Sequence, residues 1–266
     1  MLTNYHTHTN LCDGKNTPEE VVLSAVDMGF DAIGFSGHGY TDFDLTYCMK
    51  DMKVYSAEIK RLKEKYKGKI QIYLGVEEDA FYLLDRIDYD YILGSSHYFN
   101  IDGKYYPIDS NYDCFKECLK LFGGDVLTLA TSYYSAFCEY ITKRKPDIVG
   151  HFDLITKFDE LDKSLFLENK DYLNLACKYM EQAVKNDVIF EVNTGAISRG
   201  YRKNPYPHID LLHIIKKNDG KVILSSDSHD KTTLNAYFED AKKILKDVGF
   251  THTYVLYDGE FKKDLI

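Results

Sequence analysis

The chain of 266 residues lacks several features that would point to particular protein classes. It has no run of about 18 apolar residues, so no membrane-spanning helix is expected. Its six cysteines are scattered without a CxxC pair, which is typical of reduced thiols rather than of a disulfide framework. The amino-terminal residues also lack the basic start and apolar stretch of a signal peptide. We therefore expect a cytoplasmic protein without a membrane contact.

Basic residues are outnumbered, with 33 lysines and arginines against 42 aspartates and glutamates and a formal net charge of −9. This balance argues against a nucleic-acid partner, because nucleic-acid-binding surfaces are usually basic. It leaves an anionic small-molecule substrate possible, because bound cations can reverse the local field. With 44% hydrophobic residues, the chain can bury a sizeable core. The composition leaves the oligomeric state open.

Short apolar runs alternate with helical segments along the chain. The runs predict strands over 2–5, 32–36, 71–77, 91–95, 148–151, 189–193, 222–226 and 253–257. The clearest helix follows Thr17, where Pro18 suits the first helical position and Glu20 completes a capping box. Further helices are expected over 51–67, 112–122, 168–186, 209–218 and 235–248. This alternation predicts a parallel sheet or barrel in one domain over 1–266, with the tyrosine-rich stretch 100–146 as a helical excursion on its rim.

Histidines and acidic residues follow the ends of these strands. The sequences YHTHT, FSGHGY, GVEED, GSSHYF, VGHFD and SSDSH place the following residues at or just beyond a strand end: His6, His8, His38, Glu77, His97, His151, Asp227 and His229. Asp13 lies close behind the first pair. Because the carboxyl ends of parallel strands form one face, these side chains are expected to converge.

Imidazoles and carboxylates gathered in this way would be costly to desolvate without a compensating charge, which divalent cations supply. His6 and His8 point to the same face of a strand and would chelate one ion as a pair. Nine candidate ligands are too many for one ion, so two or three ions fit. Mixed histidine and carboxylate ligation suits zinc, manganese or iron, and argues against calcium or magnesium alone.

The ordered motifs HTH, GHG, GVE, SSH, GHFD and SDSH resemble those of the polymerase and histidinol phosphatase (PHP) superfamily over nearly the whole chain. Within it, the chain is similar to the monofunctional histidinol-phosphate phosphatases. This resemblance implies a distorted (β/α)7 barrel, similar to a TIM barrel, that holds three divalent ions. It also implies hydrolysis of L-histidinol phosphate to L-histidinol and phosphate in histidine biosynthesis. The eight strands expected above exceed the seven of this fold.

The resemblance also implies a distribution of the ligands. His6, His8, Glu77 and Asp227 would bind the first ion, and Glu77 would bridge to a second ion held by His97 and His151. The third ion would take His38, His229 and Asp13. Asp13 departs from relatives that have a histidine near this point, although a carboxylate can ligate equally well.

A trinuclear centre suggests a mechanism in which a metal-bridging hydroxide attacks phosphorus directly, without a phospho-enzyme. Glu77, Asp227 and Arg199 form the expected catalytic set. Arg199, and after it Arg202, follow a strand end and would bind the phosphate, for which arginine offers bidentate hydrogen bonds. The loop after His38 offers Asp42, with Asp44 near it, for the substrate ammonium group. The proton donor to the leaving group stays open between water and Asp153.

Three alternatives stay open from the sequence. The first is a related enzyme that acts on another small phosphate ester. The second is an amidohydrolase-type metal hydrolase, although Glu77 stands where a carbamylated lysine would be expected. The third is a PHP-like module that stabilises a larger polymerase.

Overall fold

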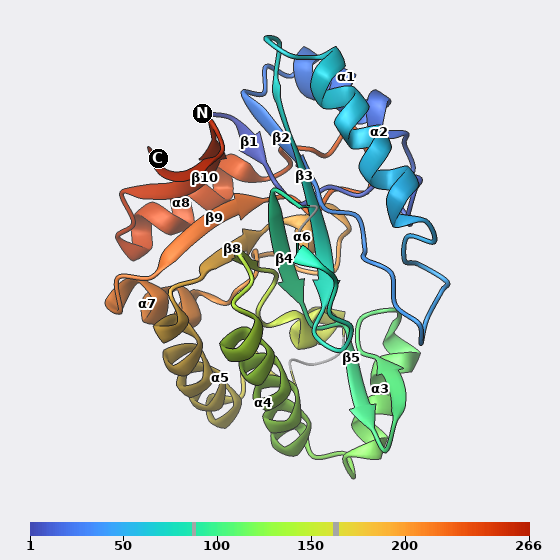
Figure 1. The fold of residues 1–266 in the computed structure, drawn as a ribbon. Helices are drawn as coiled ribbons and strands as arrows, with labels where there is room; N and C mark the ends of the chain where they lie inside the picture. Colours follow the sequence, from blue (N-terminus) through green and yellow to red (C-terminus); the bar gives the residue numbers. More distant parts are fainter. Residues whose placement is uncertain (87–88, 162–164) are drawn as a thin grey trace.

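The computed structural model describes residues 1–86, 89–161 and 165–266, and within these ranges a parallel sheet curls around a central core (Figure 1). Its parallel strands lie in the order β1 (Thr3–Asn4), β2 (Ala32–Phe35), β3 (Gln71–Asp79), β4 (Tyr91–Ser95), β7 (Ile148–Val149), β8 (Ile189–Asn193) and β9 (Lys221–Ser225). Just past β1 and β9, Thr7 and Ser228 form a parallel bridge, and the N–H of His8 donates to the carbonyl of Ser228 at 2.8 Å. The described strands thus form the distorted seven-stranded barrel that the family resemblance implies.

The eighth predicted strand lies outside this ring. β10 (His252–Tyr257) pairs with β9 at one position, Tyr254 with Ile223, and then pairs antiparallel with β11 (Glu260–Leu265). Val255 and Leu256 of β10 join the cluster inside the barrel. The terminal hairpin therefore extends the sheet and helps to fill the barrel interior, which explains the extra strand in the sequence pattern.

Tyrosines fill much of that interior. Tyr5 and Tyr91 are buried, and the Tyr91 hydroxyl donates to the carbonyl of Tyr5 at 2.6 Å. The Tyr5 hydroxyl donates to the carbonyl of Leu256 at 2.7 Å. Gly75 makes room for this packing, because a Cβ there would lie 2.1 Å from the Tyr91 ring. The hydroxyls of Tyr5 and Tyr91 thus both have a backbone acceptor, as buried polar groups require.

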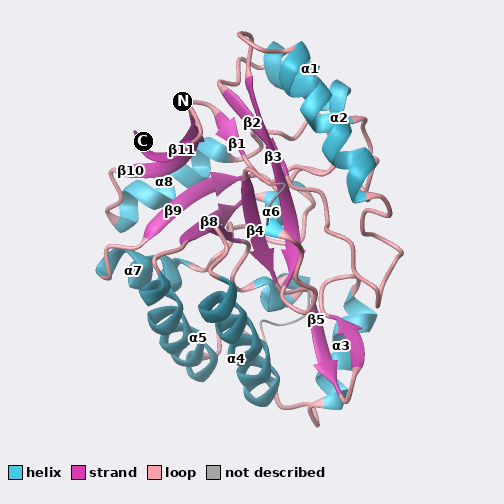
Figure 2. Ribbon diagram, in the orientation of Figure 1, coloured by secondary structure: helices cyan, strands magenta, loops and turns pink. Residues whose placement is uncertain are grey.

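Helices cover the outside of the sheet (Figure 2). They are α1 (Pro18–Asp27), α2 (Met52–Lys65), α5 (Lys170–Ala183), α7 (Ile209–Lys217) and α8 (Phe238–Val248), with the short α6 (Gly195–Ser198) after β8. Thr17 and Glu20 form the predicted capping box at the start of α1. In the described ranges, no helix combines the length and the apolar character needed to cross a membrane.

The stretch 100–146 differs from the predicted excursion on the rim. It begins within a hairpin of β5 (Tyr98–Ile101) and β6 (Lys104–Pro107), continues through α3 (Tyr112–Leu121) and ends in α4 (Val126–Arg144). Asp102 and Gly103 turn the hairpin with φ of 51° and 78°, which is the turn signal that an Asp-Gly pair carries. α4 is not on the rim: it packs against α5, where the hydroxyls of Tyr134 and Tyr172 lie 2.7 Å apart. It is therefore a regular covering helix between β4 and β7.

Candidate metal centre

The first strand delivers two buried imidazoles to the carboxyl end of the barrel. The side chains of His6 and His8 have no solvent exposure. His6 Nε2 lies 3.3 Å from Glu77 Oε2 and 3.5 Å from Asp227 Oδ1. His8 Nε2 lies 3.5 Å from the same Glu77 oxygen and 3.2 Å from the same Asp227 oxygen. Glu77 of β3 and Asp227 of the loop after β9 thus meet the histidine pair that follows β1, as the positions at strand ends predict.

Four overlapping groups of side chains each bring at least three ligand atoms within 4.8 Å of one another. They are His6, His8 and Asp227; His6, Glu77 and His151; His38, Glu77 and His97; and His8, Asp13, His38 and His229. Every one of the nine predicted ligands belongs to at least one group. Glu77 belongs to two groups, which suits the bridging role that the resemblance implies. The groups differ from the implied distribution in two ways. His97 shares a group with His38 rather than with His151, and His8 also belongs to the group of Asp13.

Several ligand atoms in these groups are buried and have no hydrogen-bond partner in the described part of the chain. These atoms are His6 Nε2, His8 Nε2 and Glu77 Oε2, although Glu77 Oε2 lies 2.8 Å from His38 Nδ1. His151 Nδ1 also has no hydrogen-bond partner, but His151 faces Glu77 Oε1 through its other ring nitrogen, Nε2, at 3.1 Å. A buried polar atom without a partner is destabilising, and native structures rarely leave several together. Divalent cations would satisfy such atoms, and the mixture of imidazole and carboxylate donors fits zinc, manganese or iron. The residues present therefore fit a multinuclear metal site.

The pKa values of the carboxylates reflect this crowding. Burial by itself raises the pKa of Glu77, but the charges of His6, His38 and His97 outweigh it and lower that pKa well below its ordinary value. Burial likewise raises the pKa of Asp227, but the charges of Arg199 and His6 outweigh this effect and lower that pKa well below its ordinary value. Both carboxylates are therefore ionised in the metal-free protein and need positive charge nearby.

The imidazoles divide into two kinds. Burial lowers the pKa of His97, but Glu77 and Asp79 outweigh it and raise that pKa to about 10. Burial, together with His229 and His38, lowers the pKa of His8 to about 3. In the metal-free protein, protonated imidazoles such as His97 therefore offset the carboxylates, and binding of a cation would release those protons.

A buried carboxylate that the sequence analysis missed holds two of these histidines. Glu191 of β8 is fully buried, and its Oε1 lies 2.6 Å from His6 Nδ1. Its Oε2 accepts hydrogen bonds from the backbone N–H of His151 and from Asn193 Nδ2, each at 2.9 Å. Such partners fix the orientation and tautomer of metal-binding histidines. The signal in the sequence was an acidic residue inside an apolar strand, two positions before Asn193.

Asp79 has a similar place beside His97. Its Oδ2 accepts from the backbone N–H of His97 at 3.1 Å and lies 3.3 Å from His97 Nδ1. Asp153, which the sequence offered as a possible proton donor, accepts a hydrogen bond from the backbone N–H of His208 at 3.0 Å.

A cavity of about 340 Å³ opens over the ligand cluster. Arg199 lines it, and its guanidinium donates to Asp227 Oδ2 at 2.9 Å and to the Asp227 carbonyl at 2.8 Å. Arg202 does not line the cavity: it is 4% exposed and donates to Thr156 Oγ1 at 2.7 Å. The structure thus separates the two arginines that the sequence put forward for phosphate, and only Arg199 faces the cavity.

The two acidic residues after His38 are also separated. Asp42 is exposed and does not line the cavity, whereas Asp44 does. The loop conformation therefore places Asp44, rather than the predicted Asp42, where a substrate could reach it.

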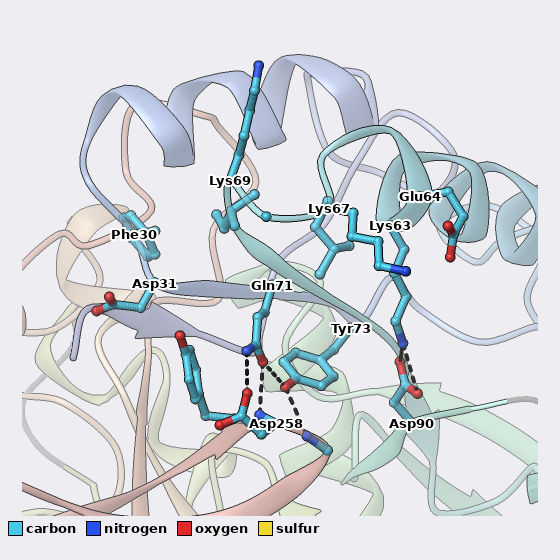
Figure 3. A pocket seen from close by; sticks show the side chains of 15 residues that line it. Phe30, Asp31, Lys63, Glu64, Lys67, Lys69, Gln71, Tyr73, Asp90 and Asp258 are labelled. Atoms are coloured by element: carbon cyan, nitrogen blue, oxygen red, sulfur yellow. Dashed lines mark hydrogen bonds and ion pairs between the residues drawn. The ribbon is translucent and has the colours of Figure 1, made fainter.

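A larger hollow of about 610 Å³ lies at the opposite end of the barrel, beside the amino ends of β2 and β3 (Figure 3). Polar side chains in it pair with one another. Lys63 Nζ lies 3.0 Å from Asp90 Oδ2, and Gln71 Nε2 donates to Asp258 Oδ1 at 2.7 Å. In the described ranges, the groups of metal-type ligands all lie at the carboxyl end, and none falls in this hollow.

Comparison with known proteins shows the family to which the chain is similar. Residues 4–195 match the family model described as PHP domain. A probable histidinol-phosphatase of Schizosaccharomyces pombe is 27% identical over 262 residues, which cover 91% of this chain and 84% of that protein. The histidinol-phosphatase of Bacillus subtilis is 26% identical over 251 residues, which cover 84% of this chain and 92% of that protein.

A solved structure shows the same fold. The histidinol phosphate phosphatase of Lactococcus lactis, in complex with zinc, L-histidinol and phosphate, superposes with a TM-score of 0.73. The superposition covers 98% of this chain and 99% of that chain, at 21% sequence identity.

Proposed function

The chain belongs to the PHP domain family, and from this membership we propose that it is a metal-dependent histidinol-phosphatase. It hydrolyses L-histidinol phosphate to L-histidinol and phosphate, a reaction of histidine biosynthesis. The names of its relatives and the ligands of the Lactococcus lactis enzyme support this substrate. One PHP domain spans 1–266.

The convergence of nine metal-type ligands, several of them with unpartnered buried atoms, carries this proposal. The overlap of the ligand groups supports three divalent ions of zinc, manganese or iron. When bound, such ions would acidify a water molecule and offset the charge of the phosphate oxygens. An amidohydrolase-type centre has less support, because the third strand supplies Glu77 rather than a carbamylated lysine.

The chain's own residues orient the reactants. Glu77 and Asp227 hold their carboxylates between the imidazoles, and Glu191 keeps His6 directed toward them. Arg199 offers a planar, bidentate donor for phosphate oxygens at the side of Asp227. A cavity of about 340 Å³ is within the size range of small-molecule sites.

Phosphate release by the purified chain tests the proposal. The protein is stripped with a chelator and then reloaded separately with zinc, manganese or iron. We expect turnover of L-histidinol phosphate to disappear on stripping and to return with at least one metal, and kcat/KM to exceed that for 4-nitrophenyl phosphate. Full activity of rigorously metal-free protein would contradict the metal dependence. A preference for 4-nitrophenyl phosphate would indicate another phosphate ester as substrate.

A further inference from the structure

One wall of the cavity carries no metal-type ligand of the groups described above. It consists of Asp44, Tyr47 and Tyr98, all of which line the cavity, and is called here the aromatic–acidic wall. The Tyr47 ring packs edge-on against the His38 ring, with 4.7 Å between centroids, so the wall begins beside a ligand group. The Tyr98 ring lies 6.0 Å from the Tyr47 ring, and its hydroxyl donates to Asp44 Oδ2 at 2.7 Å.

The charge of Asp44 sets it apart from the other carboxylates that line the cavity. Three of those carboxylates belong to ligand groups, namely Asp13, Glu77 and Asp227. Asp109 lies 3.1 Å from the ammonium nitrogen of Lys157, which neutralises it. In the described part of the chain, Asp44 has no ion pair.

The hydrogen bonds of Asp44 come from uncharged donors. Its Oδ1 accepts from the backbone N–H and from the hydroxyl of Thr46, at 2.9 Å and 2.6 Å, and its Oδ2 accepts from Tyr98. A carboxylate has about four acceptor positions, so Oδ2 retains one. An ionised carboxylate held in a cavity with a spare acceptor position favours a cationic ligand.

The wall and the phosphate-binding arginine contact different members of the ligand cluster. Arg199 contacts Asp227 and lies 3.2 Å from His229 Nδ1, whereas Tyr47 packs beside His38 and His97. The same cavity therefore offers a cation beside one ligand and an acidic, aromatic surface beside others. L-Histidinol phosphate has the complementary form, because a dianionic phosphate is joined to an ammonium group and an imidazole.

We propose that the aromatic–acidic wall selects substrates with a cationic amine. Asp44 accepts a hydrogen bond from the substrate's ammonium group, and the rings of Tyr47 and Tyr98 pack against that ammonium group and against the substrate's imidazole. Aromatic faces attract cations through their quadrupole, and a charged hydrogen bond adds direction. This inference rests on the proposed function and deepens it by assigning the residues that distinguish histidinol phosphate from other phosphate esters.

The test compares Asp44→Asn with Asp42→Asn, a matched change in the same loop at a residue outside the cavity. Each metal-loaded variant is assayed with L-histidinol phosphate and with 4-nitrophenyl phosphate, which has no amine. We expect the ratio of the two kcat/KM values to fall by about 10–100-fold in Asp44→Asn, the effect of losing a hydrogen bond to a charged group. The ratio in Asp42→Asn is expected to equal that of the parent.

Product inhibition provides a second readout that is independent of the reaction rate with the natural substrate. Against 4-nitrophenyl phosphate, L-histidinol should inhibit Asp44→Asn about 10–100-fold more weakly than the parent. Inorganic phosphate should inhibit both equally, which also shows that the metal side of the cavity is intact.

An unchanged ratio in Asp44→Asn, or equal weakening of inhibition by histidinol and phosphate, overturns the inference while the proposed function stands. A parent protein that hydrolyses 4-nitrophenyl phosphate and not histidinol phosphate overturns the proposed function, and the inference with it.

Discussion

Replacing Glu191 with glutamine changes one atom and removes a buried charge. Its Oε1 faces His6 Nδ1 at 2.6 Å, and its Oε2 accepts from two donors, the His151 backbone N–H and Asn193 Nδ2. A glutamine amide that placed its NH₂ at the Oε2 position would face both donors. Each buried donor that faces another donor destabilises the fold by about 1–3 kcal/mol, so the two donors together destabilise this orientation by about 2–6 kcal/mol.

The opposite orientation of the amide is therefore expected. Its NH₂ then faces His6 Nδ1, which can accept that hydrogen bond only when its own proton has moved to Nε2. Nε2 is the atom that faces Glu77 and Asp227 and has no hydrogen-bond partner. An ion must displace this proton before His6 can bind it. Loss of a carboxylate that hydrogen-bonds to a metal-binding histidine lowers metal affinity by about 10–100-fold, or about 1.4–2.7 kcal/mol of binding free energy.

Zinc titration of chelator-stripped protein against a competing chromogenic chelator measures this affinity. The control is Glu139→Gln, which removes an exposed carboxylate paired with Lys143 on α4. We expect Glu191→Gln to bind zinc more weakly than this control while the metal-free proteins have similar circular dichroism. Equal affinity and stoichiometry in the two variants would refute the reasoning that Glu191 sets the tautomer of His6.

Three further predictions concern the cavity and the reaction. Arg199→Ala should lower kcat/KM for histidinol phosphate by about 10–100-fold, the effect of a lost charged hydrogen bond, with metal content by mass spectrometry equal to that of the parent; unchanged kinetics would exclude Arg199 from phosphate binding. Histidinol phosphate made chiral at phosphorus should give inverted product, because direct attack by water is one in-line displacement; net retention would indicate a phospho-enzyme. Burial raises the pKa of Asp109, but the charge of Lys157 outweighs this effect and lowers that pKa below its ordinary value. The Asp109–Lys157 pair therefore stabilises the fold above about pH 3.9, and its contribution to the free energy of unfolding is lost as the pH falls further. The difference in Tm between the parent and Lys157→Met should therefore shrink on acidification, and a constant difference would contradict the assignment.

Much of the fold could be predicted because its rules are local. Apolar runs, turn residues and the capping box at Thr17 gave seven strands that the structure confirms in the ring and the alternation with helices. α4 and the β5–β6 hairpin were missed, although Asp125 caps α4 and the Asp102–Gly103 pair marks the hairpin turn. These local signals were present but lay inside a stretch read only as a helical excursion.

The candidate site was likewise predictable only in part. The sequence by itself determined that His6, Glu77, His151 and Asp227 would meet, because parallel strands bring their carboxyl ends to one face whatever their separation along the chain. Only the tertiary structure decided which of two near neighbours faces the cavity, as with Asp44 over Asp42, because loop conformation has no fixed period. The tertiary structure alone also showed that Glu191 contacts His6. These two residues lie 185 positions apart, and packing inside the barrel brings them together without a periodic pattern in either segment.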